Sequence, residues 1–172
     1  RPMRSLGSRL HSNAFLPAVC QGTPVGHDGV SAQQARIRYL SNRAQTPAQQ
    51  RTQLGLVRAL NESFQAHTAA TSEMEGLIES YELAFRMQTA APEILDLSHE
   101  TQETLDLYGV NATPTDDYGR RCLLARKLVE QGVRFVCVVS GGGPGNLQWD
   151  AHGDIEENHL RKAAETDRPV AA

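Results

Sequence analysis

The chain has 172 residues, of which 40% are apolar and 22% are charged, and its formal net charge is −3. This composition is that of a globular domain and excludes both an intrinsically disordered chain and a Cys-rich disulfide scaffold. The small net charge, without a basic patch interleaved with aromatic residues, argues against a nucleic-acid partner. No apolar stretch reaches the roughly 20 residues that a membrane-spanning helix needs, so we expect no membrane span.

The N-terminal quarter of the chain predicts little regular structure. Residues 1–46 are rich in Gly, Pro, Ser, Asn and Gln and show no sustained hydrophobic period, which is typical of loops. The chain begins at Arg1 rather than Met and shows no signal-peptide pattern, so we expect an internal piece of a longer protein.

Helical periodicity begins abruptly after this region. Thr46 is suited to cap a helix and Pro47 to occupy its first position. Apolar side chains then recur at spacings of three and four, which predicts a helix over about 47–69. The residues with this spacing are Leu54, Val57, Leu60, Phe64 and His67.

Two further helices are expected before residue 110. The first starts from a cap at Thr71 or Ser72 and ends before Pro92, and it should form a hairpin with the helix that precedes it. The second is short and ends at Gly109. We interpret 47–110 as a helical insertion.

The segment that follows predicts half of an α/β unit. A helix capped by Asp116 or Asp117 ends at Gly132, and residues 133–139 then read Val-Arg-Phe-Val-Cys-Val-Val, typical of a strand buried on both faces. One strand cannot form a sheet, so we expect its neighbours in sequence outside this chain. The predicted fold class is therefore α/β, a partial α/β/α sandwich whose core includes the helix, strand, loop and helix of 116–172.

The end of the predicted strand is a plausible place for a metal site, because ligands in open α/β sheets bind beyond the carboxyl ends of strands. Asp150 and His152, two residues apart, can offer an oxygen and a nitrogen to a divalent ion such as Zn or Mn. Asp154 and His159 are weaker candidates, as ligands or as groups that orient a ligand imidazole. The competing interpretation is an Asp that caps the next helix, with a surface His beside it.

Other candidate chemistry in this region has weaker support. The loop over 141–145 lacks the Gly-Lys-Ser/Thr ending of a phosphate-binding loop, and Pro144 removes an amide donor, so a flexible connection or lid is favoured. Ser140 lacks the turn and the base that a nucleophilic serine needs. The three cysteines lack Cys-x-x-Cys spacing, which argues against a zinc ribbon, and Cys122 and Cys137 are predicted to be core residues.

A series of motifs resembles the domain-of-unknown-function 1501 family, and the resemblance covers nearly the whole chain. An Asn-Ala-Phe-Leu-Pro-Ala segment near the N-terminus comes first. The other matching segments, in order, are Ser80–Gln88, Asp106–Gly109, Cys122–Arg126, Gly132–Val136, Trp149–Asp154 and Glu165–Pro169.

This resemblance implies a sulfatase-like protein of the alkaline phosphatase and sulfatase superfamily, a type abundant in planctomycetes. It implies an α/β/α sandwich and export through a twin-arginine signal to the periplasm or the exterior.

Asp150 and His152 match the family's Trp-Asp-x-His element, which is similar to a metal-ligand segment of the superfamily and implies bound Zn, Mn, Ca or Mg. The family's Gly-Gly-Pro-Ser, Glu-Phe-Gly-Arg and Gly-Arg-Asp-His elements are absent, so no catalytic nucleophile is identified and we expect the chain to be inactive in isolation.

Two functions follow as hypotheses. The first is a fragment of a metal-dependent sulfatase-like or phosphatase-like hydrolase that acts on small-molecule or carbohydrate esters. The alternative is a non-catalytic secreted binding or interaction protein that keeps the sulfatase-like fold and uses the helical hairpin at about 47–90 as an interaction surface. Neither hypothesis predicts an oligomeric state.

Overall fold

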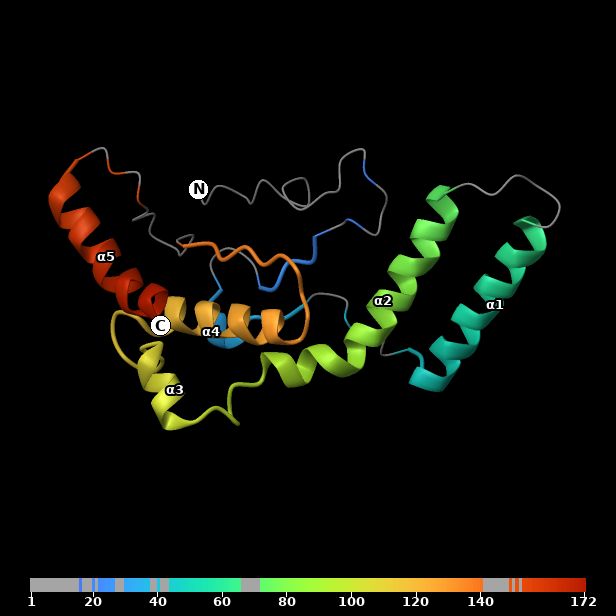
Figure 1. The fold of residues 1–172 in the computed structure, drawn as a ribbon, viewed down its shortest axis with the longest axis horizontal. Coiled ribbons are helices and arrows are strands. Elements are labelled where there is room, and N and C mark those ends of the chain that lie inside the picture. Colours follow the sequence, from blue (N-terminus) through green and yellow to red (C-terminus); the bar gives the residue numbers. More distant parts are fainter. Residues whose placement is uncertain are drawn as a thin grey trace. The chain divides into compact units, whose positions relative to one another are not determined.

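The structure is a computed structural model, and Figure 1 shows its helices in chain order. It describes residues 16, 20, 22–26, 30–37, 40, 44–65, 72–140, 149, 151 and 153–172. The described elements are the 3-10 helix η3 (Ala32–Gln34) and the α-helices α1 (Pro47–Gln65), α2 (Ser72–Leu95), α3 (Gln102–Leu107), α4 (Asp116–Glu130) and α5 (Ile155–Ala171). No helix within these described ranges is both long enough and apolar enough to cross a bilayer.

The helices belong to two compact units, which are considered separately. One contains Val25–Arg36 and Ile94–Ala172, and therefore η3, α3, α4 and α5. The other contains Ile37–Glu93, and therefore α1 and nearly all of α2.

Thr46 caps α1, as the sequence predicts, and Gln49 makes the cap reciprocal. The Gln49 backbone N–H donates to the Thr46 hydroxyl oxygen at 3.2 Å, and the Thr46 backbone N–H donates to the Gln49 side-chain oxygen at 2.8 Å. This exchange satisfies two amide groups that the first turn of a helix leaves without partners. The helix is described as far as Gln65, and its expected continuation to about residue 69 lies outside the described residues.

The predicted end of α2 before Pro92 is wrong, because the helix continues to Leu95. A proline inside a helix cannot donate to the carbonyl four residues earlier, which here belongs to Gln88. The loss of one hydrogen bond is tolerated close to a helix end, and the ribbon of α2 bends in its C-terminal part (Figure 1).

The small core of the first unit lies where α3 and α4 meet. Leu123 of α4 is fully buried and clusters with Tyr108 and Val110, which follow α3. Between these two sits Gly109 at a φ of +65°, and its carbonyl accepts the buried Thr115 hydroxyl at 2.7 Å. The glycine that the sequence predicts at the end of α3 is therefore needed for its left-handed backbone.

The C-terminal end of α4 also follows the prediction. Gly132 has a φ of +87°, its N–H donates to the Val129 carbonyl, and the Val133 N–H donates to the Leu128 carbonyl at 3.0 Å. These paired bonds are the Schellman arrangement, which uses glycine because a left-handed backbone strains other residues.

The predicted buried strand over 133–139 is wrong, and with it the predicted α/β fold class. These residues lie in no helix or sheet, Phe135 is 85% exposed, and no sheet occurs in the part of the chain that the structure describes. A strand needs a neighbouring strand to bond along its edge, and the described residues provide no such strand for this segment. Cys137, predicted to be a core residue, is exposed for the same reason, whereas Cys122 is half-buried. The described architecture is helical.

The last helix packs on α4 with an unusually polar face. Asn158, Lys162 and Thr166 are buried, and the Lys162 ammonium pairs with the Glu165 carboxylate at 2.6 Å. The Arg168 guanidinium donates to the backbone carbonyl of Asp106, which ties α5 to α3. The packing on α4 and the contact of Arg168 with α3 fix the direction of α5, whose first turn adjoins the candidate site.

Candidate metal centre

The segment that leads to the candidate site is fixed to α4 by a carboxylate–guanidinium pair. Arg121 contacts the Asp117 carboxylate at 2.6 Å and donates to the Val139 carbonyl at 3.0 Å. The same carboxylate accepts the backbone N–H of Ala32 in η3 at 2.6 Å. Two helices and the residue before Ser140 are thus connected through one Asp side chain.

Ser140, Trp149 and His159 meet beyond the end of this segment. The Trp149 indole N–H donates to the Ser140 hydroxyl oxygen at 2.8 Å. His159, in the second turn of α5, places its Nε2 atom 3.0 Å from the Trp149 carbonyl oxygen. The Trp149 and His159 rings lie 6.0 Å apart between centroids and are tilted by 41°. The contacts join residues on both sides of 141–148 to α5.

The partner of His159 determines which ring nitrogen is available for a ligand. A carbonyl oxygen only accepts hydrogen bonds, so the Nε2 atom must carry the proton and donate it. In the neutral imidazole this leaves the lone pair on Nδ1. Metal-binding histidines are commonly oriented in this way, with one nitrogen donating to a carbonyl and the other facing the ion.

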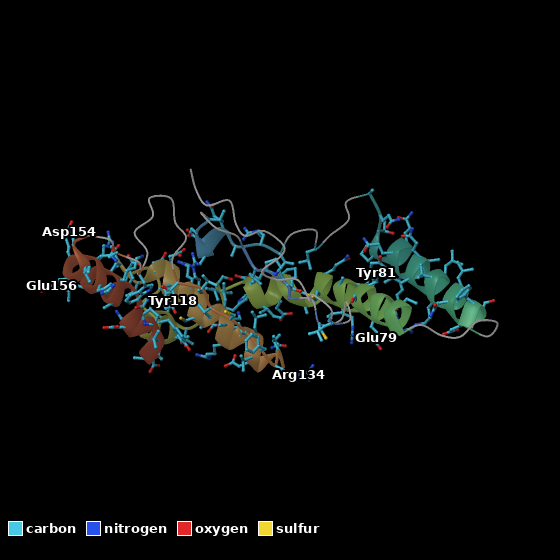
Figure 2. All side chains as sticks on the ribbon, turned by 90° about the horizontal axis from the view of Figure 1, so that it is seen from above. Glu79, Tyr81, Tyr118, Arg134, Asp154 and Glu156 are labelled. Carbon is cyan, nitrogen blue, oxygen red and sulfur yellow. The ribbon has the colours of Figure 1, made fainter. Side chains whose placement is uncertain are left out.

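Asp154 lies immediately before α5, where it occupies the N-cap position with a φ of 48° and a ψ of 45°. Its backbone carbonyl accepts the Asn158 N–H at 2.9 Å, but its side chain makes no capping hydrogen bond within the described structure. Figure 2 labels Asp154 and Glu156 at this end of the helix. A capping role therefore does not account for the Asp154 carboxylate, which is exposed and suited to bind a cation.

The two principal predicted ligands, Asp150 and His152, lie outside the described residues, as does the loop over 141–148. Among the residues that are described, no three His, Cys, Asp or Glu side chains gather closely enough to hold a metal ion. The described donors nevertheless fit such an ion chemically, since His159 offers a nitrogen and Asp154 offers oxygens.

The remaining candidate groups do not form a reactive centre. Ser140 uses its hydroxyl oxygen to accept from Trp149, and within the described structure no base hydrogen-bonds to it. Burial raises the pKa of the Cys122 thiol, and it also raises the pKa of the neighbouring Tyr118 phenol on α4 (Figure 2). Raised pKa values keep both groups protonated at neutral pH, which disfavours a nucleophilic role.

Trp149 is the residue that sequence reasoning missed. Its position directly before Asp150 drew attention only as part of a motif, whereas the structure shows that its indole and its carbonyl hold Ser140 and His159. One signal was available, because Trp149 is the single tryptophan of the chain and its indole carries a donor that seeks a partner.

Comparison with known proteins agrees with the motif series. The family model for a protein of unknown function, DUF1501, matches residues 2–172. No curated protein and no solved structure gives a significant match. Because the match extends over almost the entire sequence, the chain belongs to the DUF1501 family.

Proposed function

We propose that this DUF1501 protein is a metal-dependent hydrolase of sulfate or phosphate esters, with Asp150, His152 and His159 as metal ligands. The observation that supports the proposal is the hydrogen bond from His159 Nε2 to the Trp149 carbonyl, since Trp149 directly precedes Asp150. It leaves Nδ1 of His159 as a ligand atom and ties this imidazole to the chain next to the Asp-x-His pair.

The proposed donor set favours particular ions. Two imidazole nitrogens and a carboxylate oxygen suit Zn or Mn better than Ca or Mg, which prefer oxygen ligands. When bound, such an ion supplies Lewis-acid polarisation of an ester oxygen. The chain's own contribution is positional: Asp150 and His152 bind, the Trp149 carbonyl orients His159, and Asp154 provides negative charge at the start of α5.

Zinc titration of the purified chain by calorimetry tests the ligand assignment. We expect saturable binding that is weakened at least about tenfold by Asp150→Ala, His152→Ala or His159→Ala. His99→Ala is the matched control, because His99 is exposed and lies beside Asp96 at 3.8 Å in another part of the same unit. Absence of saturable binding, or equal affinity in the three variants and the wild type, would overturn the assignment.

A second experiment separates catalysis from binding alone. Full-length protein loaded with zinc or manganese is assayed with an aryl sulfate and an aryl phosphate, with and without a chelator. Hydrolysis that is lost on chelation supports the hydrolase. Metal binding without turnover of either ester contradicts it and favours a non-catalytic binding protein.

A further inference from the structure

Three hydrogen bonds connect helix α4 to helix α5 by way of residues on both sides of 141–148. Arg121 of α4 donates to the Val139 carbonyl at 3.0 Å, and the next residue, Ser140, accepts the Trp149 indole N–H at 2.8 Å. The Trp149 carbonyl oxygen lies 3.0 Å from Nε2 of His159 on α5. We call these five residues the α4–α5 clasp, and all of them belong to the same compact unit.

The Arg121 guanidinium is held in one orientation by Asp117. Its Nε and Nη2 atoms contact the Asp117 Oδ2 atom at 2.9 and 2.6 Å, and the other carboxylate oxygen accepts the Ala32 N–H at 2.6 Å. A planar guanidinium with two of its nitrogens occupied has little freedom to rotate. Its third nitrogen, Nη1, is the donor to the Val139 carbonyl, so this carbonyl is held to α4.

The position of Ser140 follows from the Val139 carbonyl. That carbonyl and the Ser140 N–H belong to one planar peptide unit, so a contact that fixes the carbonyl also fixes the direction in which the chain enters Ser140. Ser140 is half-buried, and its hydroxyl accepts the single donor that an indole carries. Arg121 therefore determines where the Trp149 indole finds its acceptor.

The same tryptophan makes the contact with His159. Because only two side-chain torsions separate the indole from the backbone, restraint of the indole at Ser140 also restrains the Trp149 carbonyl. Helix α5 packs on α4, so His159 approaches that carbonyl from a helix whose place also depends on α4. The carbonyl takes the Nε2 proton and leaves the lone pair on Nδ1.

Helix stability alone does not account for the arrangement of Arg121. Its ion pair with Asp117 is partly exposed, and pairs of this kind add little to stability. The pair of Asp116 and Arg120, one residue earlier, has the same spacing, but its guanidinium reaches the Asn111 side chain instead. The contact with the backbone beside Ser140 is what distinguishes Arg121.

We propose that Arg121 is a positioning residue for His159, which it orients through Ser140 and Trp149 with the lone pair on Nδ1. It acts through the Val139 carbonyl rather than by a contact with the imidazole. Its effect on metal affinity rests on the proposed function. Its effects on the Trp149 indole and on the His159 tautomer require no metal, so the metal-free chain tests them separately.

Nitrogen-15 spectra of the purified metal-free chain provide this test, because Trp149 is the single tryptophan and gives one indole N–H signal. Arg121→Met keeps the aliphatic stem and removes every donor. The indole signal should therefore shift, and His159 should change from the Nε2-protonated form toward the mixture of tautomers shown by the exposed His99. Arg120→Met is the matched control and should leave both signals as in the wild type.

A second pair of variants tests the same path at Ser140. Ser140→Ala removes the acceptor of the indole and should shift both signals as Arg121→Met does, whereas Ser140→Thr keeps a hydroxyl and should restore the wild-type signals. Circular dichroism checks that each variant keeps its helical content.

Zinc titration by calorimetry then relates the clasp to the proposed metal centre. Loss of a group that directly orients a ligand histidine typically weakens metal binding 10–100-fold, so Arg121→Met, which acts through intermediate residues, should weaken it about threefold or more. Arg120→Met should bind zinc like the wild type.

The proposal is overturned if Arg121→Met leaves the indole and His159 signals unchanged, if Arg120→Met moves them equally, or if Ser140→Ala has no effect. Equal zinc affinity of Arg121→Met and a zinc-binding wild type overturns the role of Arg121 in the metal centre. A wild type that binds no zinc but shows the expected shifts contradicts the proposed function and supports the positioning of His159 by Arg121.

Discussion

Single side chains and backbone groups determine how the candidate metal centre is held. The Asp117 carboxylate fixes Arg121, which in turn donates to the Val139 carbonyl, and the Trp149 carbonyl fixes one nitrogen of His159. The first contact lies within α4, whereas the other two join α4 to the segment that ends at Ser140 and Trp149 to α5. Each can be tested by a measurement on one residue, without assuming that the protein is an enzyme.

The His159 ring should adopt the tautomer that is protonated on Nε2, because a carbonyl partner requires a donor. Nitrogen-15 correlation spectra of the metal-free protein at a pH where imidazoles are neutral distinguish the two tautomers directly. His99, which is exposed and has no carbonyl partner in the described structure, serves as the reference. A predominantly Nδ1-protonated His159 would show that the contact with Trp149 does not exist in solution.

Two helical glycines should respond in opposite ways to alanine. A Cβ atom on Gly119 would collide with the backbone carbonyl of Tyr108, whereas a Cβ on Gly55 of α1 would meet nothing within 4 Å. Gly119→Ala should lower the free energy of unfolding by roughly 2 kcal/mol or more, because the collision involves backbone. Gly55→Ala should raise helix stability by about 0.5–1 kcal/mol, which urea titration followed by circular dichroism measures. If both alanine variants changed the free energy of unfolding equally, that result would contradict the close approach of α4 to Tyr108.

At the scale of elements, long polar side chains make the ion pairs and the hydrogen bond that join α1 to α2 in the described structure. Glu82 is largely buried and lies within ion-pair distance of both Arg51 and Arg58, which are mostly exposed. Exposed partners weaken such pairs through solvent screening, so the hairpin should be the less stable of the packed helix pairs.

Glu82→Gln should therefore destabilise the hairpin only modestly, by about 0.5 kcal/mol, with the difference from wild type shrinking as salt is added. Hydrogen exchange of the α1 amides reports this local stability. Glu79→Gln is the matched control, since Glu79 is an exposed residue of α2 (Figure 2) with no ion pair in the described structure, and should change nothing. A large loss in the control, or no change with Glu82→Gln, would contradict the role of these ion pairs.

At the scale of the whole molecule, the described core is small and large apolar side chains remain outside it. Leu123 is fully buried, while Phe135 is 85% exposed and Val139 is also exposed. Extended apolar segments without edge partners promote association with other chains. The segment over 133–139 is therefore an aggregation hazard.

Phe135→Ser should slow aggregation on warming and reduce binding of a hydrophobic dye, while leaving the free energy of unfolding within about 0.5 kcal/mol of wild type. Light scattering and urea titration measure the two effects separately. Leu123→Ala provides the contrast, since removal of a buried side chain should cost about 2–5 kcal/mol and increase aggregation. A substantially destabilised Phe135→Ser protein would mean that this ring is packed in solution.

Much of the helical structure is predictable from the sequence because its signals are local. The Thr46 cap, the left-handed Gly109 and the Schellman turn at Gly132 each depend on residues a few positions apart, and the ordered motifs identify the family. The end of α2 was missed, because a proline in the last turn removes one hydrogen bond without stopping the helix.

The sequence by itself determined the family and where most helices begin and end, since capping and periodicity involve neighbours along the chain. The tertiary structure alone decided that 133–139 does not form a buried strand, that Leu60 and Phe64 of α1 are exposed, and that His159 meets the Trp149 carbonyl. The physical reason is that an apolar run indicates burial without specifying a partner. Strand pairing, helix packing and the choice of imidazole nitrogen all depend on groups distant in sequence.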